Sequence, residues 1–547
     1  MEISGHGGNL ALPVLRAHGV REMFTLSGGH VFPLYDGAVH ADPPMPLYDV
    51  RHEQSAVFAA EAVARLNRRP GLAVLTAGPG ITNGISAITT AHFNGSPVLV
   101  LGGRAPSGLW GAGSLQELDH PQLVAAVTKL ATTAPTTADI PDYVDRALRV
   151  ATTAHRGPTF LDLPMDELFG DAKVELPAPP QRTPIGPDPG DLARVADLLR
   201  TSVRPVLLLG SDVWADGAEV AARAFAETFG IPTVTNGQGR GILPIGHPLL
   251  VTKARGQAFG GADLVIVAGT PLDFRLGFGR FGALEQEHPT PVIHLVDAPD
   301  RLGGGLVEPA ATAAGDLTAV FTGIANALTG APGRGDWLTH LQGVVSARAA
   351  KDAELLATNT PDIHPARVLG ELIPRLDADA VVIGDGGDFV SYAGRLIEPQ
   401  RPGCWLDPGP YGCLGTGLGY AMGARVARPD AQIVALLGDG AAGFSLMDVD
   451  SLIRHRMPVA LVVGNNGIWG LEKHPMQAMY GYDVVADLTP QCRYDEVVKA
   501  LGGAGEMVTD PDDLGPALDR ALAAGVPYLV NVVTDASVSY PRTTILA

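Results

Sequence analysis

Two polar residues, Asp439 and Asn466, stand just after two apolar segments in the last third of the chain. The segment Ile433–Leu437 is followed by Gly-Asp-Gly, and the segment Val459–Val463 is followed by Gly-Asn-Asn-Gly. If the two segments are neighbouring parallel strands, their carboxyl ends bring these side chains together. Carboxylate and amide oxygens are hard ligands that suit Mg²⁺, and Mg²⁺ commonly shares the oxygens of a phosphate. The spacing therefore predicts a metal site that binds a diphosphate.

Glycines surround this predicted site. Gly438 and Gly440 let the backbone approach a phosphate closely, and a helix expected from about Ser445 presents its N-terminus to negative charge. Each segment alone is also consistent with an ordinary turn after a buried strand. Their combination around one strand–helix–strand unit favours the metal site.

The elements that position these residues repeat along the whole chain. A short apolar strand, a Gly-rich turn and an Ala-rich helix recur, for example at Leu72–Thr76, Pro205–Leu209 and Val381–Ile383. Continuous apolar strands that alternate with helices indicate an α/β protein with doubly wound parallel sheets. Two Pro- and Gly-rich breaks, at 172–191 and 328–337, predict three domains over residues 1–175, 190–330 and 360–547.

Composition excludes several classes of function. The chain has 547 residues and a net charge of −19, which argues against a nucleic acid or an anionic membrane as partner. Its three cysteines cannot form a disulfide framework, which favours a reducing compartment. The sequence shows no N-terminal signal pattern and no apolar run of about 18 residues. We therefore expect a cytoplasmic protein.

The Gly-Asp-Gly and Asn-Asn pair resembles the diphosphate motif of thiamine-diphosphate-dependent enzymes of the acetolactate synthase-like superfamily. The resemblance spans the chain and implies a pyrimidine-binding domain, a Rossmann-like middle domain and a diphosphate-binding domain, with thiamine diphosphate and Mg²⁺ as cofactors. It implies that Asp439, Asn466 and the carbonyl of Ile468 bind the metal. It also implies a homodimer, or a dimer of dimers, with active sites between subunits. The implied cofactor-binding residues are Gly28, Gly29, Pro79, Asn83, Leu414, Gly438, Gly440, Ala441, Asn466 and Ile468.

The same resemblance assigns the activating carboxylate to Glu53. This residue follows the predicted strand Pro46–Val50 and precedes an Ala-rich helix at Val57–Arg65. In related enzymes such a Glu binds N1′ of the aminopyrimidine, so that the cofactor can form its carbon nucleophile. The alternative is a first-turn helix acid that the helix dipole stabilises.

The segment Gly419-Tyr420-Ala421 lacks the Pro typical of acetolactate synthases and looks like the 2-hydroxyacyl-CoA lyase and oxalyl-CoA decarboxylase branch. That branch implies cleavage of a 2-hydroxyacyl-CoA thioester into formyl-CoA and a ketone or aldehyde. The alternative is an acetolactate synthase-like carboligase that acts on a 2-oxo acid. Gln116 and Glu496 are candidates for proton handling, although Glu496 also fits an exposed helix position.

The middle domain has a Rossmann-like outline, and the resemblance implies that it holds ADP or CoA, or FAD in an acetolactate synthase-like protein. Gly210, Arg255 and Asp297 are the candidate contacts, with a turn Asp and a surface Arg as the plain alternatives. The tail Ser537–Ala547 is expected to fold as a lid, with Tyr540 and Arg542 as its key residues, or to fray.

Two other classes fit the sequence less well. An NAD(P)-dependent oxidoreductase would need a Gly-x-Gly-x-x-Gly turn after the first strand of a nucleotide-binding unit, and no clear example is present. A catalytically silent homologue should lack the activating carboxylate, whereas this chain has Glu53.

Overall fold

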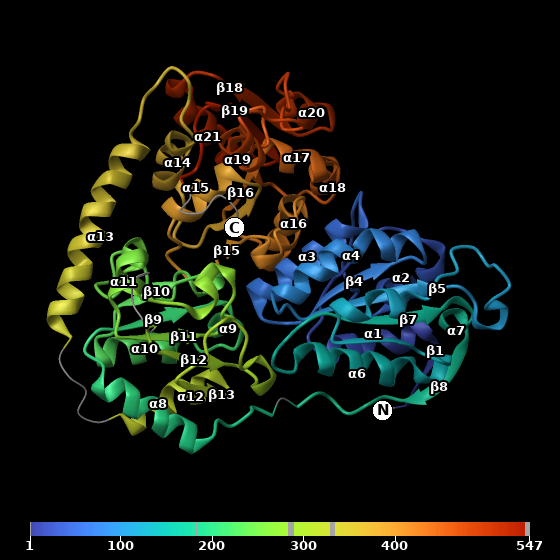
Figure 1. Ribbon diagram of the computed structural model, residues 1–547. Coiled ribbons are helices and arrows are strands. Elements are labelled where there is room, and N and C mark those ends of the chain that lie inside the picture. Colours follow the sequence, from blue (N-terminus) through green and yellow to red (C-terminus); the bar gives the residue numbers. More distant parts are fainter. Residues whose placement is uncertain (1, 182, 283–288, 329–333, 542–547) are drawn as a thin grey trace.

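The computed structural model describes residues 2–181, 183–282, 289–328 and 334–541. Three parallel β-sheets follow one another along the chain (Figure 1). Buried apolar residues pack against both faces of each sheet, as in a doubly wound α/β fold. The predicted fold class is therefore confirmed.

The first domain contains a six-stranded parallel sheet in the order β3-β2-β4-β5-β7-β6. Its strands are β2 (Met23–Thr25), β3 (Leu47–Asp49), β4 (Gly71–Leu75), β5 (Val98–Arg104), β6 (Leu130–Thr133) and β7 (Thr159–Pro164). The helices are α1 (Gly7–Ala17), α2 (Phe32–His40), α3 (Glu53–Asn67), α4 (Pro79–Phe93), α5 (His120–Val124), α6 (Ile140–Thr152) and α7 (Met165–Phe169).

One small unit departs from the all-parallel expectation. Strands β1 (Glu2–His6) and β8 (Asp171–Glu175) form a two-stranded antiparallel sheet, with Glu2 opposite Glu175. This sheet joins the start of the chain to the end of the first domain. The segments are too short and too polar for an apolar strand pattern to reveal them.

The middle domain has five parallel strands in the order β10-β9-β11-β12-β13. These strands are β9 (Pro205–Leu209), β10 (Thr233–Thr235), β11 (Leu264–Ala268), β12 (Val292–Val296) and β13 (Ala311–Ala314). The helices are α8 (Pro189–Thr201), α9 (Ser211–Ala215), α10 (Glu219–Phe229), α11 (Arg255–Gly261) and α12 (Leu317–Ala327).

The third domain has six parallel strands in the order β15-β14-β16-β17-β19-β18. These are β14 (Val381–Asp385), β15 (Trp405–Leu406), β16 (Ile433–Gly438), β17 (Ala460–Asn465), β18 (Ala504–Val508) and β19 (Tyr528–Val533). The helices are α14 (Pro365–Leu372), α15 (Asp388–Leu396), α16 (Gly417–Ala427), α17 (Asp439–Ser445), α18 (Val449–Arg454), α19 (Gly470–Tyr480), α20 (Tyr494–Ala500) and α21 (Leu514–Ala523).

The helix expected from about Ser445 in fact begins at Asp439. Helix α17 follows β16 directly, and a second helix, α18, starts at Val449. The Asp439 carboxylate accepts the N–H of Gly440, which stabilises the first helical turn. The spacing of apolar residues showed only the buried face of the later helix.

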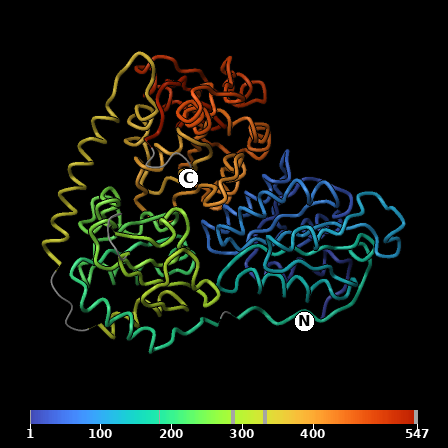
Figure 2. The backbone as a smooth tube through the Cα atoms, in the orientation of Figure 1, coloured from blue at the N-terminus to red at the C-terminus, as the bar shows by residue number. Residues whose placement is uncertain are grey.

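Two connections join the domains. Residues 176–181 and 183–188 lie between the first domain and the middle one and have no regular structure (Figure 2). The long helix α13 (Gly335–Leu356) runs from the middle domain to the third.

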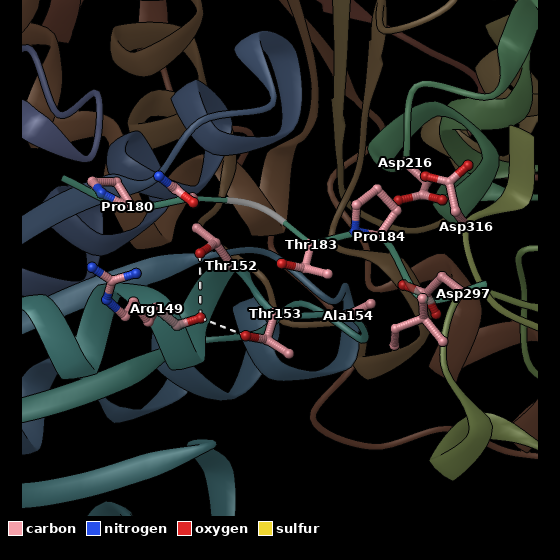
Figure 3. Close-up of a pocket in the computed structure, with 12 residues that line it drawn as sticks. Arg149, Thr152, Thr153, Ala154, Pro180, Thr183, Pro184, Asp216, Asp297 and Asp316 are labelled. Carbon is pink, nitrogen blue, oxygen red and sulfur yellow. Dashed lines mark hydrogen bonds between the residues drawn. The ribbon is translucent and has the colours of Figure 1, made fainter. Parts of the chain in front are cut away.

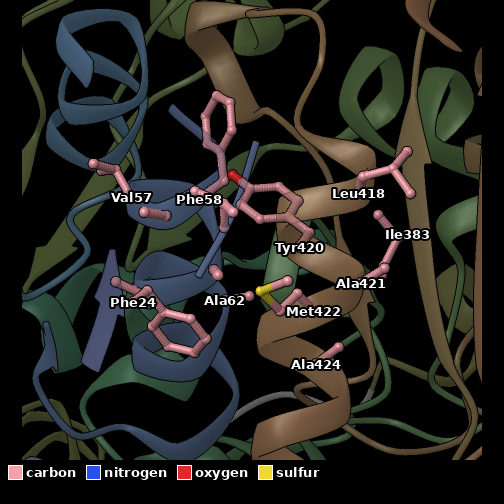
Figure 4. Packing of buried hydrophobic residues seen from close by; sticks show 14 of the residues in the cluster. Phe24, Val57, Phe58, Ala62, Ile383, Leu418, Tyr420, Ala421, Met422 and Ala424 are labelled. Carbon is pink, nitrogen blue, oxygen red and sulfur yellow. The ribbon is translucent and has the colours of Figure 1, made fainter. Parts of the chain in front are cut away.

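Helices α3 and α16 bring the first and third domains into direct contact, and their buried side chains belong to one apolar cluster (Figure 4). Small residues make this approach close. A Cβ atom on Gly423 would lie 2.2 Å from the carbonyl oxygen of Ala59, so only Gly fits there. Tyr420, fully buried between the helices, donates a hydrogen bond of 2.9 Å to Glu61.

Candidate active site

A cavity of about 280 Å³ opens at the carboxyl ends of strands β14, β16 and β17. Gly438 pairs with Gly464 in the parallel register, so the residues that follow the two strands lie side by side. Asp439, Asn466 and Ile468 all line this cavity, together with Gly438, Gly440, Ala441 and Leu414. The structure thus gathers the predicted metal and diphosphate residues at one sheet edge.

The Asp439 carboxylate is fixed in orientation. One oxygen accepts the N–H of Gly440 at 2.9 Å, and the other accepts the N–H of Gly467 at 2.7 Å. Burial raises the pKa of Asp439 to about 6. Since each carboxylate oxygen can accept more than one bond, both still have capacity for a cation.

Bare backbone surrounds this carboxylate. A Cβ atom on Gly440 would lie 2.4 Å from the ring of Trp469, so the wall of the cavity tolerates no side chain at that position. The Asn466 side-chain oxygen accepts the N–H of Ile468 at 3.1 Å and lies at the same edge. A carboxylate, an amide oxygen and exposed backbone are the groups that suit Mg²⁺ with a diphosphate, so the residues present fit that cofactor unit.

The loop that carries Leu414 is held by a residue that the sequence analysis missed. Asp385, at the end of β14, is fully buried and accepts the N–H groups of Gly415 at 3.2 Å and Gly417 at 2.8 Å. Burial raises the pKa of Asp385 to about 6. Its position after a buried strand, inside Gly-Asp-Gly-Gly, was the available signal.

The predicted residues of the first domain gather at the carboxyl end of its own sheet. Glu53 is the first residue of α3, is only 7% exposed, and accepts a hydrogen bond of 2.9 Å from Asn83 on α4. Gly28 follows β2 and packs on Thr76, since a Cβ atom there would lie 2.2 Å from the Thr76 Cβ. Pro79 opens α4 after β4.

Gln116 belongs to the same face, in the loop between β5 and α5. A Cβ atom on Gly78 would lie 2.9 Å from the Cβ of Gln116, so the loop lies against the start of α4. Gly29 begins a short 3₁₀ turn after β2, and a Cβ atom there would lie 4.0 Å from the ring of Phe32.

The cavity at Asp439 does not include Glu53. All residues that line the Asp439 cavity belong to the segment 386–472, and Glu53 is not one of them. The cavity therefore contains the predicted metal and diphosphate residues but not the predicted activating carboxylate.

Comparison with known proteins decides the family. The thiamine pyrophosphate enzyme N-terminal, central and C-terminal domain models match residues 6–123, 192–324 and 385–532. A protein of Mycobacterium bovis named "Probable acetolactate synthase" is 48% identical, with 99% of this chain and 98% of that protein covered. The chain belongs to the thiamine pyrophosphate enzyme family.

Other relatives in this family have a different name. The 2-hydroxyacyl-CoA lyase 2 of Caenorhabditis elegans is 33% identical, covering 95% of this chain and 87% of that protein. The 2-hydroxyacyl-CoA lyase 2 of Homo sapiens is 32% identical, covering 96% and 90%. The resemblance read from the motifs is confirmed at the level of the family. No helix in the described part of this thiamine pyrophosphate enzyme is both long and apolar enough to span a membrane.

Glu496 lies at the surface of the single chain. Its side chain is 52% exposed on α20 and forms ion pairs with Arg493 at 3.0 Å and Lys499 at 3.1 Å. It does not line the Asp439 cavity. The exposed-helix alternative describes this residue, because its charge is balanced by cations on its own helical face.

The predicted nucleotide contacts of the middle domain do not form one site. Asp297 is 1% exposed and accepts hydrogen bonds from Nδ1 of His155, a first-domain residue, at 3.1 and 3.2 Å. It lines a cavity of about 360 Å³ between the first two domains (Figure 3). Gly210 packs against the backbone of Gly269, and Arg255 lines a different cavity.

That second cavity, of about 730 Å³, lies between the middle and third domains. We call it the cationic cleft. Its cationic lining residues are Arg240, Lys253, Arg255, Arg275, Arg348 and Arg395, and its acidic ones are Asp352, Glu398 and Asp407.

The C-terminal tail reaches the cationic cleft. Tyr540 lines it and packs edge-on against Tyr392 with ring centres 5.1 Å apart, while the Tyr392 hydroxyl donates to the Ser539 carbonyl at 3.0 Å. The start of the tail is therefore docked on the third domain. Arg542 lies outside the described residues.

Proposed function

We propose that this enzyme cleaves a 2-hydroxyacyl-CoA thioester to formyl-CoA and a ketone or aldehyde, with thiamine diphosphate and Mg²⁺ as cofactors. When bound, thiamine diphosphate supplies the carbon nucleophile for such a reaction. Asp439, Asn466 and the Ile468 carbonyl would hold the metal, and Glu53 would hold a proton at N1′ of the aminopyrimidine. Leu414 would support the cofactor from the cavity wall.

The observation that carries the CoA assignment is Arg255 in the cationic cleft. This guanidinium donates to the carbonyl of Arg275 at 2.6 Å and lies over the ring of Phe259, but no carboxylate of the described residues lies within 4 Å of it. Burial lowers the pKa of Arg255, since removing the cation from water is unfavourable. A phosphate of CoA, or of ADP, would supply the missing anion.

The rest of the cleft supports the same assignment. Lys253 and Arg395 both bind Asp352, at 2.7 and 2.6 Å, and Arg275 binds Asp273 at 2.7 Å. Cationic lining residues nevertheless outnumber the acidic ones, in a chain whose net charge is −19. The cleft is a local exception to the acidic surface, as a polyanionic substrate requires.

We also propose that the working unit is at least a homodimer. Glu53 does not line the Asp439 cavity of its own chain, which supports a second copy as its source. Large apolar side chains remain exposed near both halves, including the stacked Phe93 and Tyr411, Phe444 and Leu115. Light scattering coupled to size exclusion should give at least twice the chain mass of 56.8 kDa.

A second candidate is an acetolactate synthase-like carboligase, with FAD in the middle domain. The identity of 48% to the Mycobacterium bovis protein named "Probable acetolactate synthase" favours it. The two functions differ in one experiment. The purified protein, supplied with thiamine diphosphate and Mg²⁺, is given either a 2-hydroxyacyl-CoA or pyruvate, and products are separated by liquid chromatography.

Formation of formyl-CoA with no acetolactate supports the lyase. Acetolactate from pyruvate, with FAD released on denaturation, contradicts it. The Arg255→Met variant should raise KM for the CoA thioester more than tenfold, whereas Arg348→Met, at an exposed cation of the same cleft, serves as the control.

A further inference from the structure

A buried His–Asp pair lies behind the loop that carries Gln116. His120 and Asp162 are both fully buried. The Nδ1 atom of His120 lies 3.0 Å from the Asp162 carboxylate, while its Nε2 accepts the backbone N–H of Gly78 at 2.9 Å. Because Nε2 accepts a hydrogen bond, the ring proton must sit on Nδ1 and point to Asp162.

The hydrogen bond to Gly78 fixes a tight contact. Gly78 adopts a left-handed backbone conformation with φ of 61° just before α4, and Gln116 opposite it has φ of 60°. A left-handed conformation in a residue other than Gly is unfavourable and persists only where its surroundings impose it. His120, four residues after Gln116, ties this part of the loop to the start of α4.

Asp162 also binds the other end of the same loop. Asp162 lies on β7 beside β5, and it accepts a hydrogen bond of 2.8 Å from Arg104, the last residue of β5. Arg104 stacks over the ring of Trp110, 3.6 Å from its centre, inside the loop. One buried carboxylate therefore holds both Arg104, just before residues 105–119, and His120, just after them.

Much of the loop between these two anchors is exposed. Residues 111–113 are exposed, and Leu109 and Leu115 are 58% and 77% exposed. Glu117 accepts the N–H groups of Gly111 and Ser114 within the loop itself. At its start, the Asp166 carboxylate on α7 accepts the N–H groups of Ser107 and Gly108 at 2.8 and 2.9 Å. Burial contributes little to the order of residues 111–113, so the two anchors at the ends of the loop should contribute much of it.

We propose that the Arg104–Asp162–His120 group is a clamp that sets the conformation of residues 105–119, and that His120 is a positioning residue for Gln116. The kinetic part of this inference rests on the proposed function, with Gln116 as the candidate for proton handling. The structural part concerns the loop alone and holds for either candidate reaction.

The test compares two substitutions of His120 in the cofactor-free dimer or oligomer as purified. His120→Gln keeps an acceptor for the Gly78 N–H, whereas His120→Leu keeps neither hydrogen bond. Hydrogen exchange measured by mass spectrometry should show at least tenfold faster exchange in residues 105–119 for His120→Leu, and less than threefold for His120→Gln. His18→Leu removes a different His–Asp bond of the first domain, at 2.8 Å, and should leave the loop unchanged.

Turnover gives the second readout. His120→Leu should raise KM for the 2-hydroxyacyl-CoA substrate more than tenfold, while the affinity for thiamine diphosphate changes less than twofold. His120→Gln should have a KM much closer to that of the wild-type protein. Unchanged exchange in His120→Leu, or equal defects in both variants, overturns the proposal. If His120→Leu fails to fold, Arg104→Gln tests the other anchor by the same exchange measurement.

The outcomes separate this inference from the proposed function. If the wild-type protein cleaves no CoA thioester but the exchange pattern is as expected, the clamp stands and the proposed reaction is wrong. If the protein is active and the loop exchange is insensitive to both anchors, the clamp is wrong and the reaction stands.

Discussion

Replacing Glu53 by Gln should separate cofactor binding from turnover. The Glu53 carboxylate is 7% exposed, and its one hydrogen bond to a side chain comes from Asn83 at 2.9 Å, among the described residues. The substituted amide has the same shape and keeps an oxygen that can accept from Asn83. The fold should therefore lose only the difference between a charge-assisted and a neutral hydrogen bond, about 1 kcal/mol.

The loss of turnover should be much larger. The amide cannot hold a proton at N1′, and removal of such a group typically lowers the rate about 10²- to 10⁴-fold, or about 3 to 5 kcal/mol of barrier. The metal and diphosphate groups lie in a cavity that Glu53 does not line, so the affinity for thiamine diphosphate with Mg²⁺ should change less than threefold. Steady-state kinetics and isothermal titration calorimetry measure the two quantities on the same preparation.

The matched control is Glu61→Gln, on the same helix two turns later. Glu61 is fully buried and accepts hydrogen bonds from Asn94, Ser96 and Tyr420, none of which lines the Asp439 cavity. This variant should lose stability but keep turnover within threefold. Near-normal turnover of Glu53→Gln, or an equal loss in both variants, would refute the assignment of Glu53.

Three further substitutions test single contacts. Gly440→Ala places a Cβ atom 2.4 Å from the ring of Trp469, so the cavity wall must move, and calorimetry should show at least tenfold weaker diphosphate binding. The control is Gly443→Ala, whose added Cβ atom has no neighbour within 4 Å and should leave binding normal. Equal affinities in the two variants would contradict the close fit at Gly440. Gly423→Ala overpacks the contact with α3 and should cost about 1–3 kcal/mol in urea unfolding, while an unchanged midpoint would show that the helices can separate freely. Burial raises the pKa of Asp385 from 3.8 to about 6, so the folded protein keeps this proton longer than the unfolded chain. The free energy of unfolding of the cofactor-free protein should therefore fall by up to about 3 kcal/mol as pH rises from about 4 to 6. Thermal melts of Asp385→Asn should lack this dependence on pH. The same dependence in both proteins would contradict its assignment to Asp385.

The local pattern of the chain was enough to predict the α/β fold and the gathering of Asp439 with Asn466. Both residues directly follow continuous apolar segments, and such segments form neighbouring parallel strands whose carboxyl ends meet. The start of α17 was missed because it depends on the hydrogen bond between the Asp439 carboxylate and Gly440, which leaves no trace in the spacing of apolar residues.

Tertiary structure alone decided the contacts between distant segments. The sequence left Glu496 open between proton handling and an exposed helix position, and the structure pairs it with Arg493 and Lys499 at the surface of the chain. Asp297 follows a strand as an adenosine contact would, but its carboxylate accepts a hydrogen bond from His155 of the first domain. Such pairings depend on how whole domains pack, and a residue's own neighbours in the chain do not determine them.

The sequence by itself determined the chemistry that each strand end can offer, because that chemistry depends on residue types next to a buried strand. Only the tertiary structure showed that Glu53 does not line the Asp439 cavity of its own chain, and that Asp162 binds a residue at each end of the Gln116 loop. Arg104 and Asp162 are 58 positions apart in the chain, and His120 and Asp162 are 42 apart. Their energies come from burial and hydrogen bonding across the fold, which the order of residues does not reveal.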